Sequence, residues 1–91
     1  MELHAGEIVS SKAGRDKGKY FVVMETIDAQ WVMICDGKLR KVDRPKKKKI
    51  KHLAKTGTTA AYVAEKLKLG ERVTNPDLRR ALSGMENNVD V

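Results

Sequence analysis

The sequence predicts a mainly β domain followed by two short helices. In the first half, short β-branched and aromatic runs alternate with turns rich in glycine and charge, a pattern typical of strands. Later in the chain, apolar residues recur at helical spacing instead. A chain of 91 residues suits one small domain with a small core. We therefore expect a β-rich unit over residues 1–55, a helical extension over residues 56–85 and a disordered tail over residues 86–91, with a short linker at residues 54–57.

The β-rich unit should contain four or five short strands. Asp36 and Gly37 form a two-residue hairpin signal between apolar runs. Pro45 interrupts pairing, and the lysine-rich segment after it suits an exposed edge strand. The expected strands cover residues 3–12, 19–27, 31–35, 39–42 and 47–53. So many short strands joined by tight turns predict a small SH3-like barrel.

The turn between the first two strands, residues 13–18 (AGRDKG), is too rich in glycine and charge to be a strand. Gly14 and Gly18 are its structural residues. Gly18 ends the turn just before the longest apolar run, where a positive φ lets the backbone re-enter a strand. A turn of this kind, held by flanking strands, presents its side chains as a contact surface.

Two amphipathic helices are expected in the extension. Thr59 is the expected cap of the first helix and Gly70 its end. Asn75 and Pro76 open the second helix as cap and first-turn proline, and Gly84 is its expected end. The apolar stripes are Ala60, Val63, Ala64 and Leu67 in the first helix and Leu78, Ala81, Leu82 and Met85 in the second. Helices this short are not stable alone, so they should pack on the barrel or on each other.

The positive charge is concentrated in one stripe. Nineteen basic and twelve acidic residues give a net charge of +7. Residues 38–55 contain ten basic residues and one acidic residue, whereas residues 56–91 contain five of each and residues 1–37 contain four and six. Such a stripe makes a polyanion the first candidate partner.

A second basic cluster surrounds the turn. A lysine run alone is most often a solvated segment, but two clusters attached to strands favour nucleic-acid binding by phosphate neutralisation. The candidate RNA-binding residues are Lys12, Arg15, Lys17, Lys19 and Tyr20 near the turn, and Arg40, Lys41, Arg44, Lys46, Lys47, Lys48, Lys49 and Lys51 in the stripe. Phosphate contacts do not distinguish RNA from DNA, and the same run is compatible with a nuclear-localisation signal.

Aromatic residues are few. Single-strand binders need exposed aromatic rings on which bases stack. We expect Trp31 to belong to the core, as its apolar strand run indicates, and Tyr20, beside the basic turn, to be the best stacking candidate. The small number favours recognition of folded RNA by shape and charge.

Catalytic and metal sites are not expected. Two histidines far apart and one cysteine show no zinc-ligand spacing. The turn lacks the GxxxxGK[ST] spacing and the following helix of a phosphate-binding loop. We therefore expect a noncatalytic protein without a cofactor.

The compartment is indicated by the same residues. Cys35, the one cysteine, cannot form an intrachain disulfide and lies in an apolar run, so we expect a buried thiol in a reducing compartment. The first residues lack the features of a signal peptide, and no apolar run approaches the ~20 residues that span a bilayer. A cytoplasmic protein without a membrane partner is expected.

The turn and its flanks resemble a KOW motif, the strand–loop–strand unit of several ribosomal proteins and transcription elongation factors. More narrowly, residues 5–53 resemble the archaeal and eukaryotic large-subunit ribosomal protein fourteen family and its short bacterial relatives. The matching segments are the turn at residues 13–19, Ile27-Asp28 before an apolar strand, and a basic run closing on His52-Leu53. The resemblance implies an SH3-like barrel that binds ribosomal RNA of the large subunit.

Together, these observations predict a noncatalytic RNA-binding protein of the ribosome or its assembly, acting in translation. Its expected partners are structured RNA, namely ribosomal RNA of the large subunit, and a ribosomal protein at the C-terminal helices; the free protein is expected to be a monomer. The alternative is a protein-interaction module that docks on a ribosomal or transcription-elongation protein. Double-stranded DNA binding is a third hypothesis.

Overall fold

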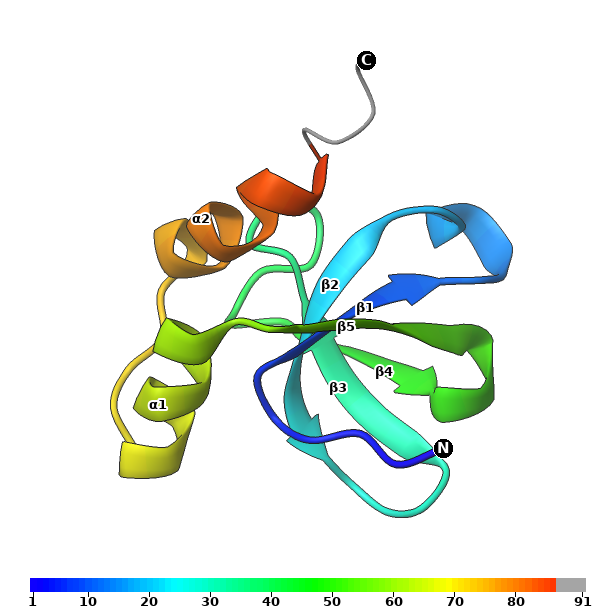
Figure 1. The fold of residues 1–91 in the computed structure, drawn as a ribbon, viewed down its shortest axis with the longest axis horizontal. Helices are drawn as coiled ribbons and strands as arrows, with labels where there is room; N and C mark the ends of the chain where they lie inside the picture. The colour runs from blue at the N-terminus through cyan, green and yellow to red at the C-terminus, as the bar shows by residue number, and fades with distance from the viewer. Residues whose placement is uncertain (87–91) are drawn as a thin grey trace.

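A computed structural model describes residues 1–86 and shows one antiparallel sheet with two helices against it (Figure 1). The strands are β1 (Glu7–Ser11), β2 (Tyr20–Thr26), β3 (Trp31–Cys35), β4 (Lys46–Lys49) and β5 (Leu53–Thr59). Two single 3₁₀ turns, η1 (Gly14–Asp16) and η2 (Ile50–His52), and the helices α1 (Ala61–Leu69) and α2 (Asn75–Glu86) complete the described chain. The predicted mainly β fold with two C-terminal helices is confirmed.

The sheet bends because its two edge strands are consecutive in the sequence. The strand order is β4-β3-β2-β1-β5, so β4 and β5 lie at opposite ends of the sheet. In a flat sheet these ends would be about 19 Å apart. Only η2 connects them, and the chain from Lys49 to Leu53 spans at most ~14 Å. The sheet must therefore curl until its edges approach each other, which gives a barrel-like shape compatible with an SH3-like fold.

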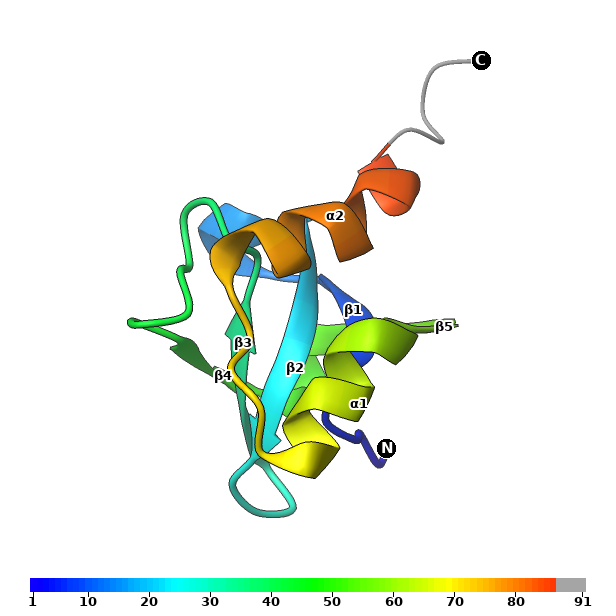
Figure 2. The same ribbon diagram turned by 90° about the vertical axis from the view of Figure 1, so that its left-hand side faces the viewer.

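Each face of the sheet packs against its own apolar cluster. The inner cluster fills the curled sheet and contains Leu3, Val9, Phe21, Val23, Val32, Ile34, Ile50 and Leu53. The outer cluster joins Ile8, Val22 and Cys35 of the strands to Ala60, Val63, Val73, Leu78 and Leu82 of the helical part. Neighbouring strand residues point to opposite faces, so the apolar run of β2 is buried on both sides. Figure 2 faces the helices and shows α1 and α2 lying across the outer side of the sheet. The expectation that they pack on the barrel or each other is confirmed.

The helix starts differ from the prediction. Thr59 is the last residue of β5, and Ala60, which makes no side-chain capping bond, precedes α1. At α2 the cap is Thr74: its Oγ1 accepts from the Asp77 amide (3.2 Å), and Asp77 Oδ2 accepts from the Thr74 amide (3.0 Å). This reciprocal pair is a capping box. The predicted caps at Thr59 and Asn75 are therefore wrong.

Of the two predicted helix ends, Gly70 is confirmed and Gly84 is wrong. Gly70 ends α1 with φ +73°, as expected, and the next amide bonds back to the carbonyl of Lys66 (2.8 Å). Gly84 does not end α2, which continues to Glu86. A glycine inside a helix costs about 1 kcal/mol, and burial of Leu78 and Leu82 outweighs that cost. The predicted tail begins inside α2 at Glu86, and its residues 87–91 lie outside the described residues.

Several predicted strands and one predicted linker differ from the structure. Residues 39–42 are not a strand but part of a loop over residues 37–45. The lysine run itself forms β4 and pairs with β3, so its predicted edge position is confirmed but its strand ends at Lys49. Residues 54–57, expected as a linker, belong to β5, which pairs with β1. The first strand is also shorter than expected, because residues 3–6 precede β1. In each case long-range pairing, which local composition does not record, decides the strand.

Candidate nucleic-acid interface

The turn between β1 and β2 is closed by its own hydrogen bonds. Gly14 and Gly18 have φ values of +77° and +85°, which confirms the expectation for Gly18. The Gly18 amide donates to the carbonyl of Ser11 (2.9 Å), and the Lys17 amide donates to the carbonyl of Gly14 (3.2 Å). The basic residues of the turn, Lys12, Arg15, Lys17 and Lys19, are all exposed. The backbone is thus fixed while its cations remain accessible.

Asp16 joins the turn to the lysine-rich strand. Its carboxylate is buried and pairs through Oδ2 with Lys46 Nζ at 3.1 Å and with Arg40 Nη2 at 3.5 Å. Burial raises the pKa of Asp16, but the hydrogen bond and charge of Lys46 and the charge of Arg40 outweigh burial and hold the pKa below its ordinary value. We call Asp16, Arg40 and Lys46 the Asp16 clasp. It ties two basic clusters that lie far apart in the sequence.

No sequence pattern predicts this clasp. The only signal was one acidic residue among the basic residues of the turn. Its partners stand 24 and 30 positions later in the chain, so no local pattern connects them. The carboxylate cancels part of the local positive charge, and in return it holds the turn to Arg40 and Lys46.

The four lysines of β4 fall into two pairs. Lys47 and Lys49 lie opposite Met33 and Trp31, and their ammonium groups stand 4.8 and 5.4 Å from the centre of the Trp31 ring. The other two lysines of β4, Lys46 and Lys48, point to the opposite side, toward the turn. The predicted lysine run is therefore not one uniform surface.

The two aromatic candidates are both partly buried but have different neighbours. Trp31 belongs to neither apolar cluster and is partly exposed under the two lysines, whereas Tyr20 packs against the outer cluster. The expectation that Trp31 is a core residue is wrong, and the stacking role expected of Tyr20 stays a prediction. Exposed lysine–aromatic contacts of this kind contribute ~0.5–1 kcal/mol each. The cause is strand alternation: Val32 and Ile34 occupy the inner core, so Trp31 must face outward.

Hydrogen bonds to α2 hold the loop over residues 37–45. Arg79 Nη1 donates to the carbonyl of Gly37 (2.8 Å), and the Val42 amide donates to Asn75 Oδ1 (2.8 Å). A side chain at Gly37 would collide with the backbone of Asn75, so the contact is close. Figure 2 shows this loop beside the start of α2. The loop carries three predicted site residues, Arg40, Lys41 and Arg44, and α2 fixes its position.

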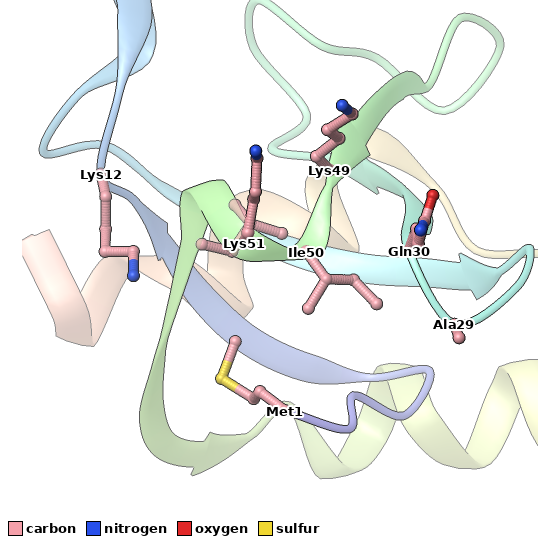
Figure 3. Close-up of a pocket in the computed structure, with 8 residues that line it drawn as sticks. Met1, Lys12, Ala29, Gln30, Lys49, Ile50 and Lys51 are labelled. Atoms are coloured by element: carbon pink, nitrogen blue, oxygen red, sulfur yellow. The ribbon is translucent and has the colours of Figure 1, made fainter.

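Lysines from both basic clusters meet at an open hollow of about 460 Å³ (Figure 3). Lys12 comes from the end of β1, Lys49 from the end of β4 and Lys51 from η2. Two backbone bonds hold these segments together: the Lys12 amide donates to the carbonyl of His52 and the Ile50 amide to that of Gln30, both at 2.8 Å. The remaining lining residues are Met1, Ala29, Gln30, Ile50 and Leu53.

The structure therefore gathers part of the predicted site and disperses the rest. One group lines the hollow, a second forms the clasp and a third covers Trp31. Arg15, Lys17 and Lys19 project from the turn, and Lys41 and Arg44 project from the loop before β4, all exposed. All these cations border the turn, β4 and the loop that precedes it, away from α1.

Within residues 1–86, no group of three or more His, Cys, Asp or Glu side chains is placed so that it could hold a metal ion. Cys35 is buried, and burial, followed by the charges of Asp36 and Asp43, raises the pKa of its thiol to about 11. The thiol is thus protonated and unreactive at neutral pH. In the same part of the chain, neither helix has the length and apolar character needed to cross a bilayer.

Comparison of the chain with models of protein families gives no match, and neither does comparison with curated proteins. The resemblance to KOW-containing ribosomal proteins therefore rests on the turn at residues 13–19, the Ile27-Asp28 pair and the basic run that closes on His52-Leu53.

Proposed function

We propose that the protein is a noncatalytic RNA-binding protein, with an SH3-like KOW barrel that holds folded RNA against its basic turn and its lysine-rich edge strand. The observation that carries the proposal is the Asp16 clasp. Its ion pairs of 3.1 and 3.5 Å fix two basic clusters relative to each other on a rigid sheet. A cationic surface with a set geometry suits a partner whose phosphates also have a set geometry.

Folded RNA is such a partner. Lysine and arginine bind phosphates by neutralising charge and releasing counterions, and this contribution is independent of sequence. Selectivity then comes from the spacing of the cations. In folded RNA the phosphates of neighbouring strands hold fixed positions, whereas in an unstructured strand they do not. A fixed pair of clusters therefore favours folded RNA over unstructured RNA of equal charge.

Ribosomal RNA of the large subunit is the proposed target. The resemblance of residues 5–53 to the large-subunit ribosomal protein fourteen family supports this choice. Large ribosomal particles and their precursors contain abundant folded RNA with many phosphates close together. A place in translation or ribosome assembly, and a cytoplasmic location, follow from that target.

A second candidate function is docking on a ribosomal or transcription-elongation protein. One observation favours it: α1 leaves two large apolar side chains in solvent, Tyr62 and Leu69, which are 59% and 58% exposed. Beside Tyr62, residues of both α1 and α2 line a hollow of about 180 Å³. This surface lies away from the basic turn, so it is compatible with RNA binding as well as with an independent role.

A sucrose gradient of cell lysate tests the proposal. The protein should sediment with large ribosomal particles or their precursors at low salt and be released progressively as salt rises, because its phosphate contacts depend on counterions. Ribonuclease should release it as well. If the protein remains at the top of the gradient at low salt, even after crosslinking in cells, the ribosomal assignment is wrong. A complex that survives both ribonuclease and salt would favour the second candidate.

A further inference from the structure

We infer that Trp31, with Lys47 and Lys49, forms a stacking site for one unpaired nucleotide of the bound RNA. We call these three residues the Trp31 platform. The inference rests on the proposed RNA-binding function and deepens it, because it assigns recognition of a base to a surface that otherwise contacts only phosphates.

The platform occupies the part of the outer face of the sheet that the helices leave open. Opposite residues of paired strands share a face, so Trp31, Lys49, Met33 and Lys47 all lie on the outer side of β3 and β4. The helices cover that side farther along, where Cys35 ends β3 inside the outer cluster. One strand thus passes from a covered core to an open surface, and its tryptophan lies on the open part.

The lysines above the ring are replaceable by a base. An exposed lysine–aromatic contact is weaker than the stacking of a base on an aromatic ring. A base that stacks on Trp31 therefore displaces the two ammonium groups from the ring. They can then approach the phosphates on either side of that base, where they also release counterions. Both changes favour a nucleotide as the occupant.

The surrounding charges orient the nucleotide. Glu25 of β2 lies opposite Met33 on the same outer face, so a carboxylate borders the platform on the β2 side. The phosphates should therefore lie toward β4. Lys49 also lines the hollow with Gln30, the residue that precedes Trp31, and Figure 3 shows both at one side of the hollow with Lys12 at the other. The chain of the RNA can continue from the platform toward these lysines.

Folded RNA supplies suitable nucleotides. Bases in bulges and loops are unstacked and available to aromatic side chains, whereas bases within a helix are not. The sharpest probe is a pair of RNA duplexes that differ only in one bulged nucleotide. Their charge is almost equal, so phosphate contacts alone predict nearly equal affinity.

Trp31 is the only tryptophan of the chain, so its fluorescence reports on the platform directly. The bulged duplex should quench its emission and bind about tenfold more tightly than the paired duplex, which corresponds to ~1.4 kcal/mol. The ratio of the two affinities should fall only in part as salt rises, because stacking is not electrostatic whereas the phosphate contacts of the displaced lysines are. The paired duplex should leave the emission nearly unchanged.

Variants distinguish the contribution of the Trp31 ring to binding from its contribution to folding. Trp31→Leu should abolish the preference for the bulged duplex, measured by anisotropy of labelled RNA, and Trp31→Phe should keep most of it. The matched control is Tyr62→Leu, because Tyr62 is also an exposed aromatic residue with a lysine, Lys66, 4.8 Å from its ring centre. This control should leave the preference intact. If Trp31→Leu does not fold, the emission of the unaltered protein still decides the question.

The outcomes are distinct. Salt-sensitive binding of both duplexes with equal affinity and no quenching would overturn the platform and leave the proposed function standing. Loss of the preference in Tyr62→Leu but not in Trp31→Leu would also overturn it. Failure to bind either duplex at low salt would overturn the proposed function and the platform together.

Discussion

The outer face of the sheet has two regions that differ in what covers them. Over β1, β2 and the end of β3, apolar side chains such as Ile8 and Val22 are buried under the helices. Over β4 and the start of β3, lysines surround a partly exposed tryptophan. The covered region depends on apolar burial and the open region on charge. Stability and binding should therefore respond to different substitutions.

The largest effect is expected in the covered region. Leu78 of α2 is fully buried in the outer cluster, so Leu78→Ala should lower the free energy of unfolding by ~2–5 kcal/mol through lost burial and a cavity. Leu69→Ala is the matched control, because Leu69 is largely exposed on α1, and it should change stability by less than ~0.5 kcal/mol. Urea denaturation measures both. Equal losses of stability in the two variants would contradict the division of the outer face into a covered and an open region.

A smaller loss of stability is expected at the basic turn. Gly18 has φ +85° and open space around it, so the cost of Gly18→Val is backbone strain, ~1–3 kcal/mol. Gly84 is also surrounded by open space but is helical, so Gly84→Ala should stabilise the protein by about 1 kcal/mol.

Replacing Arg15 and Lys17 together by Gln should spare stability and weaken RNA binding. A turn that tolerates Gly18→Val but unfolds with the glutamine pair would contradict this account.

Binding should depend unequally on the lysine pairs of β4. Each phosphate contact contributes ~0.7–0.9 to the slope of log affinity against log salt. Replacing Lys47 and Lys49 by Gln should lower the slope by about 1.5. Replacing Lys46 and Lys48 should lower it less, because Lys46 is already paired with Asp16. Anisotropy titrations over a salt series measure the slopes. Unchanged slopes in both variants would show that β4 does not contact phosphates.

The Asp16 clasp links the fold to the open region. Asp16→Asn leaves Lys46 and Arg40 without their carboxylate and should lower stability by about 1–2 kcal/mol, less than for a fully buried pair because both cations are about one-third exposed. The variant gains a positive charge, so simple electrostatics predicts tighter binding of any RNA. If the clasp sets the geometry, the preference for folded over unstructured RNA should fall instead. An unchanged preference would contradict the geometric role.

Acid provides an independent test of the clasp. The pKa of Asp16 lies below its ordinary value of 3.8 in the folded protein. The carboxylate therefore contributes stability that is fully present well above pH 3.8 and is lost as pH falls through the lower folded-state pKa. Other carboxylates titrate in the same range, so the informative quantity is the difference between the unaltered protein and Asp16→Asn. This difference should shrink on acidification, as measured by thermal unfolding at several pH values.

Some features of the fold and of the candidate site could be predicted from the sequence, and others could not. The turn at residues 13–18, the positive φ of Gly18 and the end of α1 at Gly70 depend on local backbone chemistry and were predicted. The lysine-rich edge strand was predicted, but its end at Lys49 was not, because that end depends on its pairing with β3. The Asp16 clasp and the exposure of Trp31 depend on contacts between segments distant in sequence. Single-sequence periodicity carries no information on such contacts.

The smallest expected effect lies where the covered and open regions meet. Asn75 Oδ1 accepts the Val42 amide, and this bond ties α2 to the loop that carries Arg40, Lys41 and Arg44. Asn75→Ala leaves that amide without its acceptor and should lower stability by ~1 kcal/mol without changing charge. Because the loop loses an attachment to α2, RNA affinity should fall a few-fold.

Amide hydrogen exchange separates the steps of this prediction. Exchange at Val42 should accelerate in Asn75→Ala and stay slow in Asn75→Asp, which keeps an oxygen acceptor. The capping box of α2 uses Thr74 and Asp77, so neither variant removes the helix cap. Unchanged exchange at Val42 would show that Asn75 does not hold the loop. Faster exchange with unchanged RNA affinity would show that the loop is held but does not bind RNA, which would confine the interface to the turn and β4.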